Sequence, residues 1–418
     1  MNVLVVGGGG REHAICWALK KSSRVDRLYC APGNGGISDI AQCVDIKATD
    51  IDGMVDFVKN NDIDFVMVAP DDPLALGMVD AMEKNGIRTF GPRANAAIIE
   101  SSKIFSKNLM EKYGIPTAYY KVFTESSDAI KYIEEKGAPI VVKADGLALG
   151  KGVVVAQTVE QAKDAVVSMM EDKKFGNSGS KVVIEEFMTG PEVTVLAFTD
   201  GKAIVPMLSS QDHKRVYNDN KGPNTGGMGA FCPSPNYTAE VADICMKTIF
   251  RPTIEAMKKE GRPFKGVIYF GLMLTPEGPK VVEYNARFGD PETQPILSML
   301  KTDILDIFEA VVDEKLADID IKWEDGYACC IVAASGGYPG SYETGYEIFG
   351  LESVPEDVTV FHAGTKKRDG KYYTSGGRVL GVTAKDDTLG GAARKAYEGM
   401  KHISFENMHY RTDIAAKY

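Results

Sequence analysis

Apolar and polar positions follow one another along the first hundred residues in an order that predicts a regular succession of strands, turns and helices. Residues 2–6 have the pattern of a buried strand, with a continuous apolar run at residues 3–6, and Gly7–Gly10 follow at once. Residues 11–20 then carry apolar side chains at helical spacing. Strands that alternate with helices indicate a doubly wound α/β domain, which we place at residues 1–100. Further strand patterns lie at 27–30 and 64–69, and further helix patterns at 51–60 and 74–84.

The middle of the chain has a different order, because a glycine-rich loop and not a helix joins two of its strand patterns. A long helical pattern from Ala94 to Tyr113 leads into this part. Residues 140–143 and 153–156 have strand patterns, and residues 144–152 form the loop between them. A direct loop of this kind joins antiparallel neighbours, so we expect a flap subdomain over about residues 120–188.

The last part of the chain is rich in strand patterns with few helices. Strands are expected at 329–334, 343–348, 358–361 and 379–384, followed by a helix at 389–403. This pattern indicates an antiparallel-rich α+β domain with few candidate catalytic groups. A chain of 418 residues is too long for one core. We therefore expect three domains, at 1–100, 101–325 and 326–418.

Composition and charge exclude several classes of protein. The net charge of −10 argues against a nucleic-acid surface, and no apolar run approaches the roughly 20 residues of a membrane span. The N-terminus lacks the basic region of a signal peptide. Seven cysteines without a Cys-x-x-Cys pair fit a reducing compartment. We expect a cytoplasmic monomer whose partners are small molecules, with no nucleic acid and no membrane among them.

The glycine turn after the first strand is a candidate anion site. Backbone N–H groups at the start of a helix attract phosphate or carboxylate groups, and glycines let the ligand approach closely. The turn is a poor dinucleotide fingerprint, because Glu12 occupies the position of the third glycine. No acid follows the second strand, which ends in Ala31–Gly36, to hold a ribose. A phosphate or amino-acid site therefore fits this turn better than NAD does.

Residues 281–294 contain a strand pattern whose alternate positions are polar. Glu283, Asn285 and Arg287 share one face, while Tyr284 and Ala286 belong to the other. Carboxylate and amide oxygens suit Mg²⁺, and a guanidinium suits a phosphate. Taken alone, a sheet edge with a solvated polar face explains the pattern equally well.

Two further stretches have the character of a nucleotide site. Lys143 and Lys151 flank a loop rich in glycine and alanine that can fold over a triphosphate. The loop does not match the spacing of a Walker A motif and leads into a strand, so a flexible hairpin is the alternative. After the strand that ends near Ile184, the peptide groups of Glu185–Phe187 can hydrogen-bond the edge of an adenine ring.

A polar cluster at Asp212–Arg215 lies between strand patterns and follows neither helical nor strand spacing. Such clusters on loops are often functional, and the alternative is a solvated turn. The cluster combines a carboxylate, an imidazole, an ammonium group and a guanidinium within four positions. A second glycine turn follows at Thr225–Gly229.

Together these features suit ATP and Mg²⁺ without a P-loop, and in order and character they resemble the ATP-grasp superfamily. Longer motifs resemble the family of phosphoribosylamine–glycine ligases, or glycinamide ribonucleotide synthetases, over the whole chain. Two departures from the family pattern are Asp71 after Pro70, where glutamate is common, and the lack of a third metal-binding acid in residues 267–274. The most specific motifs are Gln-Asp-His-Lys-Arg at 211–215 and Arg-Phe-Gly-Asp-Pro-Glu at 287–292, and the others lie at 5–13, 31–34, 142–152, 222–229, 334–340 and 361–365.

The resemblance implies an ATP-grasp fold for residues 101–325 and a carbon–nitrogen ligase of purine biosynthesis. Such an enzyme uses ATP to join glycine to 5-phosphoribosylamine through glycyl phosphate, and releases glycinamide ribonucleotide, ADP and phosphate. The implied metal ligands, for Mg²⁺ or Mn²⁺, are Glu283 and Asn285, and the implied catalytic residues are Arg287 at the transferring phosphoryl group, Asp212, Lys214 and Asp290, with glycine near the two aspartates. The implied ATP-binding residues are Lys103, Lys143, Gly146, Gly150, Lys151, Gly152, Glu185, Glu186, Phe187 and Glu192. The implied substrate-binding residues are Gly9, Gly10, Arg11, Glu12, Asn34, His213, Gly227 and Thr293, with the ribose phosphate at the first glycine turn.

Three other functions compete with this one. Another ATP-grasp ligase, such as a carboxylase or a D-alanine–D-alanine-type ligase, differs in residues 210–215 and 287–294. A non-catalytic nucleotide sensor needs no phosphoryl-transfer groups, whereas Glu283, Asn285 and Arg287 are all present. A dehydrogenase is disfavoured by Glu12 and by the missing ribose acid.

Overall fold

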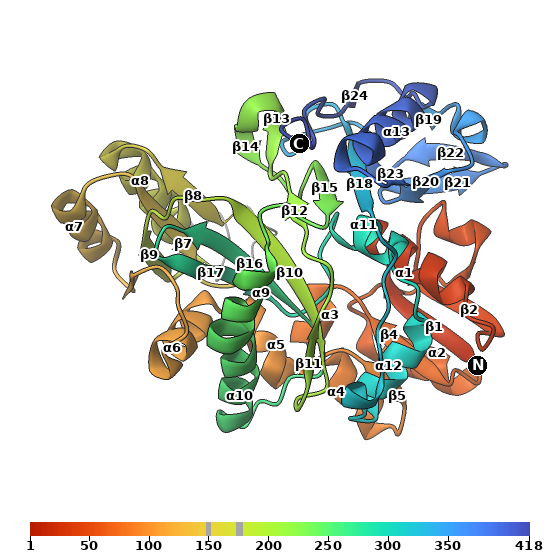
Figure 1. The fold of residues 1–418 in the computed structure, drawn as a ribbon, viewed down its shortest axis with the longest axis horizontal. Coiled ribbons are helices and arrows are strands. Elements are labelled where there is room, and N and C mark those ends of the chain that lie inside the picture. Colours follow the sequence, from red (N-terminus) through yellow and green to blue (C-terminus); the bar gives the residue numbers. More distant parts are fainter. Residues whose placement is uncertain (148–151, 173–178) are drawn as a thin grey trace.

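The computed structural model describes residues 1–147, 152–172 and 179–418. The N-terminal parallel sheet and most of the C-terminal strands lie at one end of the molecule, as Figure 1 shows. The flap, with helices α7 (Ser126–Lys136) and α8 (Val159–Val166), lies at the opposite end. Long antiparallel strands run between the two ends, so three differently built parts can contribute to one central site.

The parallel sheet expected in the first hundred residues is confirmed. Its strands pair in the order β3-β2-β1-β4-β5, and every pair is parallel. Side chains of the first strand enter cores on both faces of the sheet, which explains the continuous apolar run at residues 3–6. The strands are β1 (Asn2–Gly7), β2 (Arg27–Pro32), β3 (Gln42–Cys43), β4 (Phe65–Val68) and β5 (Arg88–Phe90), and the helices are α1 (Gly10–Lys20), α2 (Ile51–Asn60), α3 (Asp71–Ala75), α4 (Met78–Lys84) and α5 (Ala94–Ser101).

The prediction of a single helix from Ala94 to Tyr113 is wrong, because Ser102 interrupts the helix. Ser102 has an extended backbone (φ −134°, ψ 112°), and its hydroxyl oxygen accepts a hydrogen bond from the Phe105 N–H at 3.1 Å. A second helix, α6 (Lys103–Tyr113), therefore begins there with a side-chain cap. The break places Lys103 in the first turn of α6, where its side chain reaches the flap.

The flap contains the expected strand–loop–strand order within an antiparallel sheet, β6-β9-β7-β8. Helices α7 and α8 pack on one face, where Ile140 and Val142 are buried. The alternate side chains Val141 and Lys143 face the other way, toward the cleft described below. The strands are β6 (Tyr120–Phe123), β7 (Ile140–Ala144), β8 (Val153–Ala156) and β9 (Val182–Glu186).

A second antiparallel sheet, with the order β11-β10-β16-β17, forms the centre of the molecule. Helical residues 239–259 pack on one face of it through side chains such as Phe250 and Met257. They comprise α9 (Ala239–Cys245), a π-helical turn (Met246–Phe250) and α10 (Arg251–Lys259). The strands are β10 (Glu192–Thr199), β11 (Ile204–Pro206), β16 (Gly266–Thr275) and β17 (Gly278–Asn285), and α11 (Thr293–Ser298) and α12 (Ile304–Val312) follow.

The C-terminal sheet also contains two strands from the middle of the chain. Its order is β12-β15-β18-β23-β20, with β12 (Gln211–Asp212) and β15 (Gly229–Cys232) at one edge. The polar residues 211–215 are thereby connected to the C-terminal strands. The domain boundary expected at residue 326 stays a prediction. The expected strand at 343–348 is reduced to β19 (Glu347–Ile348). The other elements are β13 (Arg215–Tyr217), β14 (Lys221–Asn224), β18 (Tyr327–Ser335), β20 (Val358–His362), β21 (Thr365–Arg368), β22 (Lys371–Thr374), β23 (Arg378–Asp386), α13 (Leu389–His402) and β24 (Met408–His409).

A hydrogen bond links strand β20 of the C-terminal sheet to helix α1 of the N-terminal domain. The Nδ1 atom of His13 accepts from the His362 N–H at 2.7 Å, and burial lowers the pKa of His13 to about 3, so its ring is neutral. In the part of the chain that the structure describes, no helix has the length and apolar character needed to cross a membrane.

Candidate functional site

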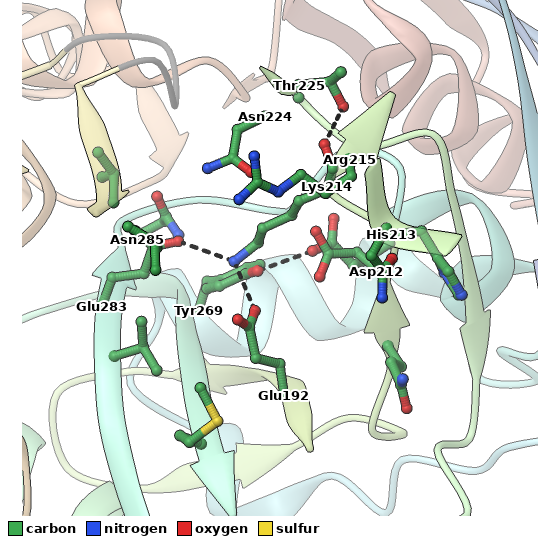
Figure 2. A pocket seen from close by; sticks show the side chains of 18 of the residues that line it. Glu192, Asp212, His213, Lys214, Arg215, Asn224, Thr225, Tyr269, Glu283 and Asn285 are labelled. Atoms are coloured by element: carbon green, nitrogen blue, oxygen red, sulfur yellow. Dashed lines mark hydrogen bonds and ion pairs between the residues drawn. The ribbon is translucent and has the colours of Figure 1, made fainter. Parts of the chain in front are cut away.

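A cleft of about 1300 Å³ lies where the flap, the central sheet and the C-terminal strands meet. Its size is that of a site for a large ligand or for several small ones. Side chains from all three parts line it, and Figure 2 shows the central group of them. Most of the residues that the sequence pattern selected are among these lining residues, as the following paragraphs describe.

The alternating face of β17 and the residues after it opens into the cleft. Glu283, Asn285 and Arg287 all line it, and the side chains of Tyr284 and Ala286 pack in the buried core. Strand β17 is an edge of its sheet, as the alternative interpretation held, but its polar face is directed into a cavity and not into open solvent. The three polar side chains lie on one face, as the alternation predicts.

Arg287 is held by a buried carboxylate that the sequence pattern did not reveal. Its Nη2 lies 2.9 Å from Oε1 of Glu100, a side chain on α5. The second oxygen of Glu100 accepts the Ala286 N–H at 2.7 Å, which also fixes the backbone beside Arg287. The buried Nε of Arg287 has no hydrogen-bond partner within the described residues. This free donor can serve an anionic ligand.

Lys214 extends into the centre of the site between two carboxylates (Figure 2). Its Nζ lies 3.3 Å from Glu192 Oε2 and 3.7 Å from Glu283 Oε1. Burial lowers the pKa of Lys214, but Glu192, Asp212 and Glu283 outweigh it and hold the pKa well above its usual value. Lys214 is therefore a fixed positive charge beside the proposed metal ligand.

Asp212 forms part of an acidic group at the deep end of the cleft. Burial raises its pKa to about 7, and Glu292, Glu192 and Glu283 add to the rise, while Lys214 opposes it. Glu292 also lines the cleft and accepts a hydrogen bond from the Tyr269 hydroxyl at 2.9 Å. Neither Glu292 nor Tyr269 was selected from the sequence. An acidic group of this kind suits a substrate ammonium.

His213 takes a different position from its neighbours in the same cluster. Its ring packs against Phe231 and points away from the Lys214 ammonium (Figure 2). Burial lowers the pKa of His213 to about 4, so the imidazole is neutral at physiological pH. Its side chain lines the cleft, and the predicted contact with a substrate stays a prediction.

The half of the cleft in which the sequence predicts the nucleotide is built from the flap and from α6. Lys143 forms an ion pair with Glu185 at 2.9 Å and donates to the Val282 carbonyl at 3.0 Å. Lys103 donates to the Gly146 carbonyl at 2.9 Å, and burial lowers the pKa of Lys103. The other residues predicted to bind ATP that line the cleft are Gly152, Glu186, Phe187 and Glu192, whereas Gly150 and Lys151 lie outside the described residues.

The first glycine turn reaches the cleft through one side chain. Arg11 lines the cleft, with Nε 2.7 Å from Glu12 Oε1 and Nη1 3.1 Å from the Phe288 carbonyl. Glu12 itself accepts the Gly9 N–H at 2.6 Å, which closes the start of α1. Asn34 uses both ends of its amide on backbone groups, including the Gly8 carbonyl at 3.0 Å and the Ile37 N–H at 2.9 Å. These contacts shape the turn, and Gly9, Gly10, Glu12 and Asn34 are not among the described lining residues.

The C-terminal strands supply more groups to the cleft than the few expected from their sequence. Arg378 lines it and donates to the carbonyls of Asp290 at 2.7 Å and Gly226 at 2.8 Å. Burial raises the pKa of the Asp290 carboxyl, but Arg378 and Arg11 outweigh it and hold the pKa below its usual range. Tyr338 and Tyr342 line the same region, whereas Gly227 and Thr293 are not among the described lining residues.

Four cations act on the Glu283 carboxylate in the cleft. Burial raises the pKa of Glu283, but Lys214, Lys143, Lys103 and Arg287 outweigh it, and the pKa lies below its usual value. A cavity with four cations around one carboxylate attracts a ligand with several negative charges. A triphosphate has that charge, and phosphoryl transfer depends mainly on positioning and charge neutralisation.

The donor set fits a hard divalent cation that shares its ligands with such an anion. Glu283 and Asn285 offer a carboxylate and an amide oxygen from one face of β17. The described residues include no group of three or more His, Cys, Asp and Glu side chains able to hold a metal. Phosphate and water oxygens would complete the coordination, which is a usual arrangement for Mg²⁺.

Comparison with known protein families gives matches along most of the chain. Residues 1–100 match the N domain of phosphoribosylglycinamide synthetase, residues 101–293 its ATP-grasp (A) domain, and residues 328–417 its C domain. A phosphoribosylamine–glycine ligase from Caldanaerobacter subterraneus is 49% identical over 418 residues, which is the full length of both chains.

Solved structures agree with this match. The phosphoribosylamine–glycine ligase of Thermotoga maritima is 32% identical and aligns with a TM-score of 0.86 over 99% of this chain and 100% of that one. The biotin carboxylase domain of a Hydrogenobacter thermophilus carboxylase aligns with a TM-score of 0.75 at 14% identity, over 98% and 91% of the two chains. The second likeness concerns the fold alone, whereas the match of residues 101–293 to the ATP-grasp (A) domain confirms the expected ATP-grasp architecture.

Proposed function

Because the chain belongs to the phosphoribosylglycinamide synthetase family, we propose that its cleft carries out the family's ligation with the residues described above. The chain is an ATP-dependent carbon–nitrogen ligase of purine biosynthesis. It joins glycine to 5-phosphoribosylamine and forms glycinamide ribonucleotide, ADP and phosphate. The observation that carries the assignment of residues is the convergence of Glu283, Asn285 and Arg287 on one cleft.

We assign the flap side of the cleft to ATP. Lys103 and Lys143 contact its phosphates, together with Lys151 and the glycines of the flap loop. The backbone of Glu185–Phe187 at the end of β9 contacts the adenine edge, and Glu192 contacts the ribose. The location of Lys143, Glu185 and Glu192 along one side of the cleft supports this orientation.

A divalent cation completes the ATP site, and we propose Mg²⁺ with Glu283 and Asn285 as its protein ligands. When bound, the ion neutralises charge on the phosphate oxygens. Lys214 lies beside Glu283 and contributes a permanent positive charge there. Arg287, fixed by Glu100, contacts the phosphoryl group as it moves to the carboxylate of glycine, so that glycyl phosphate forms.

The second step joins the amine of phosphoribosylamine to the activated carbonyl group. We place the glycine ammonium near Asp212 and Glu292, and the ribose phosphate near Arg11 and Arg378. Both arginines line the cleft at the end where the N-terminal turn and the C-terminal strands meet. Asp290 lies near both arginines and forms an ion pair with the Arg378 guanidinium at 3.4 Å. Glycine is thus held between the ATP site and the amine, as the two steps require.

Replacement of Asp212 with asparagine tests the glycine site. The raised pKa of Asp212, about 7, means that its carboxylate gains charge as the pH rises through neutrality. The wild-type kcat/KM for glycine should therefore rise between about pH 6 and pH 8, whereas the variant should lack this step and be about 30-fold lower at the upper end. Steady-state phosphate release at several pH values measures both effects. Equal profiles for the two proteins would remove Asp212 from glycine binding.

The overall activity is tested by phosphate release from ATP. Glycine and freshly generated phosphoribosylamine are omitted in turn from otherwise complete reactions. We expect release to require glycine, and sustained turnover to require both substrates. Release that does not depend on glycine would contradict the proposed chemistry, and a different acceptor would then have to be sought.

A further inference from the structure

Lys107 is a buried ammonium group at the base of the nucleotide half of the cleft, and the mechanism above does not use it. Its side chain, one turn after Lys103 on α6, is 2% exposed. Its Nζ donates to Thr117 Oγ1 at 2.8 Å and to the Ala118 carbonyl at 3.3 Å. It also lies 3.2 Å from Oε1 of Glu185 in an ion pair. A buried lysine with this set of partners has little freedom to bind a ligand itself.

Among the described residues, Lys107 is the only cation paired with one of the two carboxylate oxygens of Glu185. That oxygen, Oε1, accepts no hydrogen bond within the described part of the chain, while Oε2 is paired with Lys143 at 2.9 Å. The three side chains are each at most 4% exposed. Their charges sum to one positive charge, and removal of Lys107 would leave Glu185 to neutralise Lys143 alone.

The same contacts connect the flap to the strand that carries the proposed metal ligands. Thr117 donates its hydroxyl to the Val281 carbonyl at 2.7 Å, and Lys143 donates to the Val282 carbonyl at 3.0 Å. The line of contacts from Thr117 through Lys107, Glu185 and Lys143 thus begins and ends on adjacent carbonyls of β17. Glu283 is the next residue along that strand.

We propose that Lys107 is a positioning residue for the nucleotide: it holds Glu185 so that the Lys143 ammonium faces the phosphates, and it supplies the positive charge that the flap side needs. This role rests on the proposed placement of ATP. Two of the three Lys143 donors have protein partners, Glu185 and Val282, which leaves one for the ligand. Without Lys107 the Glu185 carboxylate can turn toward Lys143 and compete for that donor.

Replacement of Lys107 with methionine tests the proposal, because methionine keeps the apolar stem and removes the charge. The Kd for ADP and the KM for ATP should each rise about tenfold, while kcat stays within about threefold of wild type. Isothermal titration calorimetry measures the first value, and phosphate release measures the others. Lys112→Met is the matched control, since Lys112 lies on the same helix in an exposed pair with Glu260, and it should leave ADP binding unchanged.

The pH dependence of ADP binding separates this role from a merely structural one. Burial lowers the pKa of Lys107 to about 8, and Lys143 lowers it further, while Glu185 and Glu186 raise it. The Tyr120 ring, 5.5 Å away, is the other group that faces it. Wild-type binding should therefore weaken relative to the methionine variant between about pH 7 and pH 9, as Lys107 loses its proton. A ratio of affinities that stays constant over this range would overturn the proposal.

Lys107→Gln covers the case in which the methionine variant folds poorly. Glutamine can still donate to Thr117 and Ala118 but has no charge. It should bind ADP about tenfold more weakly than wild type, and wild-type affinity would overturn the proposal. Binding of ADP needs neither glycine nor phosphoribosylamine. A failure of the proposed ligation would thus appear in phosphate release, whereas a failure of the role of Lys107 would appear in ADP binding.

Discussion

Replacement of Arg287 with alanine should lower turnover by about a thousandfold and leave ADP binding within a few-fold of wild type. The guanidinium lies in the cleft, and its Nη2 donates to Asn285 Oδ1 at 3.3 Å. In the proposed arrangement Lys103 and Lys143 hold the bound nucleotide, so loss of Arg287 removes a contact to the moving phosphoryl group. Phosphate release under saturating substrates measures the first value, and calorimetric titration with ADP measures the second. An unchanged turnover would show that Arg287 has no role at the phosphoryl group.

The buried partner of Arg287 requires a control. Alanine leaves Glu100 without its counterion, and breaking a buried pair costs about 3–5 kcal/mol of stability. The double variant Arg287→Ala/Glu100→Gln removes the orphaned charge while keeping a group that can accept the Ala286 N–H. Its melting temperature should rise toward that of wild type while turnover stays low. Recovery of turnover together with stability would mean that the single variant failed through local unfolding.

The parts of the site that follow local patterns could be predicted from the sequence. The face of β17 is an example, because alternate residues of a strand share a side whatever lies opposite them. The helix break at Ser102 and the location of Lys107 on the cleft side of α6 also follow from local patterns in the sequence. A serine next to a polar turn is a good helix cap, and a lysine four residues after Lys103 lies on the same face of α6.

Pairings between distant segments could not be predicted in this way. Glu100 meets Arg287 only because α5 packs beside β17, and nothing near residue 100 marks that carboxylate as a partner. Strand β12 is two residues long, so it has no periodicity of its own, yet it fixes Asp212 to the C-terminal sheet. Arg378 is a similar case. The pairing of β23 within the C-terminal sheet brings Arg378 to the cleft, and the sequence around Arg378 does not predict that pairing.

Replacement of Glu283 with glutamine should change the metal dependence of the reaction most strongly. The amide keeps an oxygen donor in place but loses the negative charge that a divalent cation requires, and it leaves Lys214 and the nearby cations without this acid. We expect the Mg²⁺ concentration for half-maximal activity to rise at least about tenfold, and turnover at saturating Mg²⁺ to fall about a hundredfold. Phosphate release across a Mg²⁺ titration measures both values.

Glu192→Gln is the matched control for this experiment, because Glu192 also contacts Lys214 but belongs to the ribose side of the cleft. It should raise the KM for ATP and leave the Mg²⁺ dependence as in wild type. If both variants shift the Mg²⁺ dependence equally, the effect comes from the charge of Lys214, and Glu283 is not a metal ligand. A shift confined to Glu283→Gln ties the cation to β17, where its charge acts on the same phosphate group that Arg287 contacts.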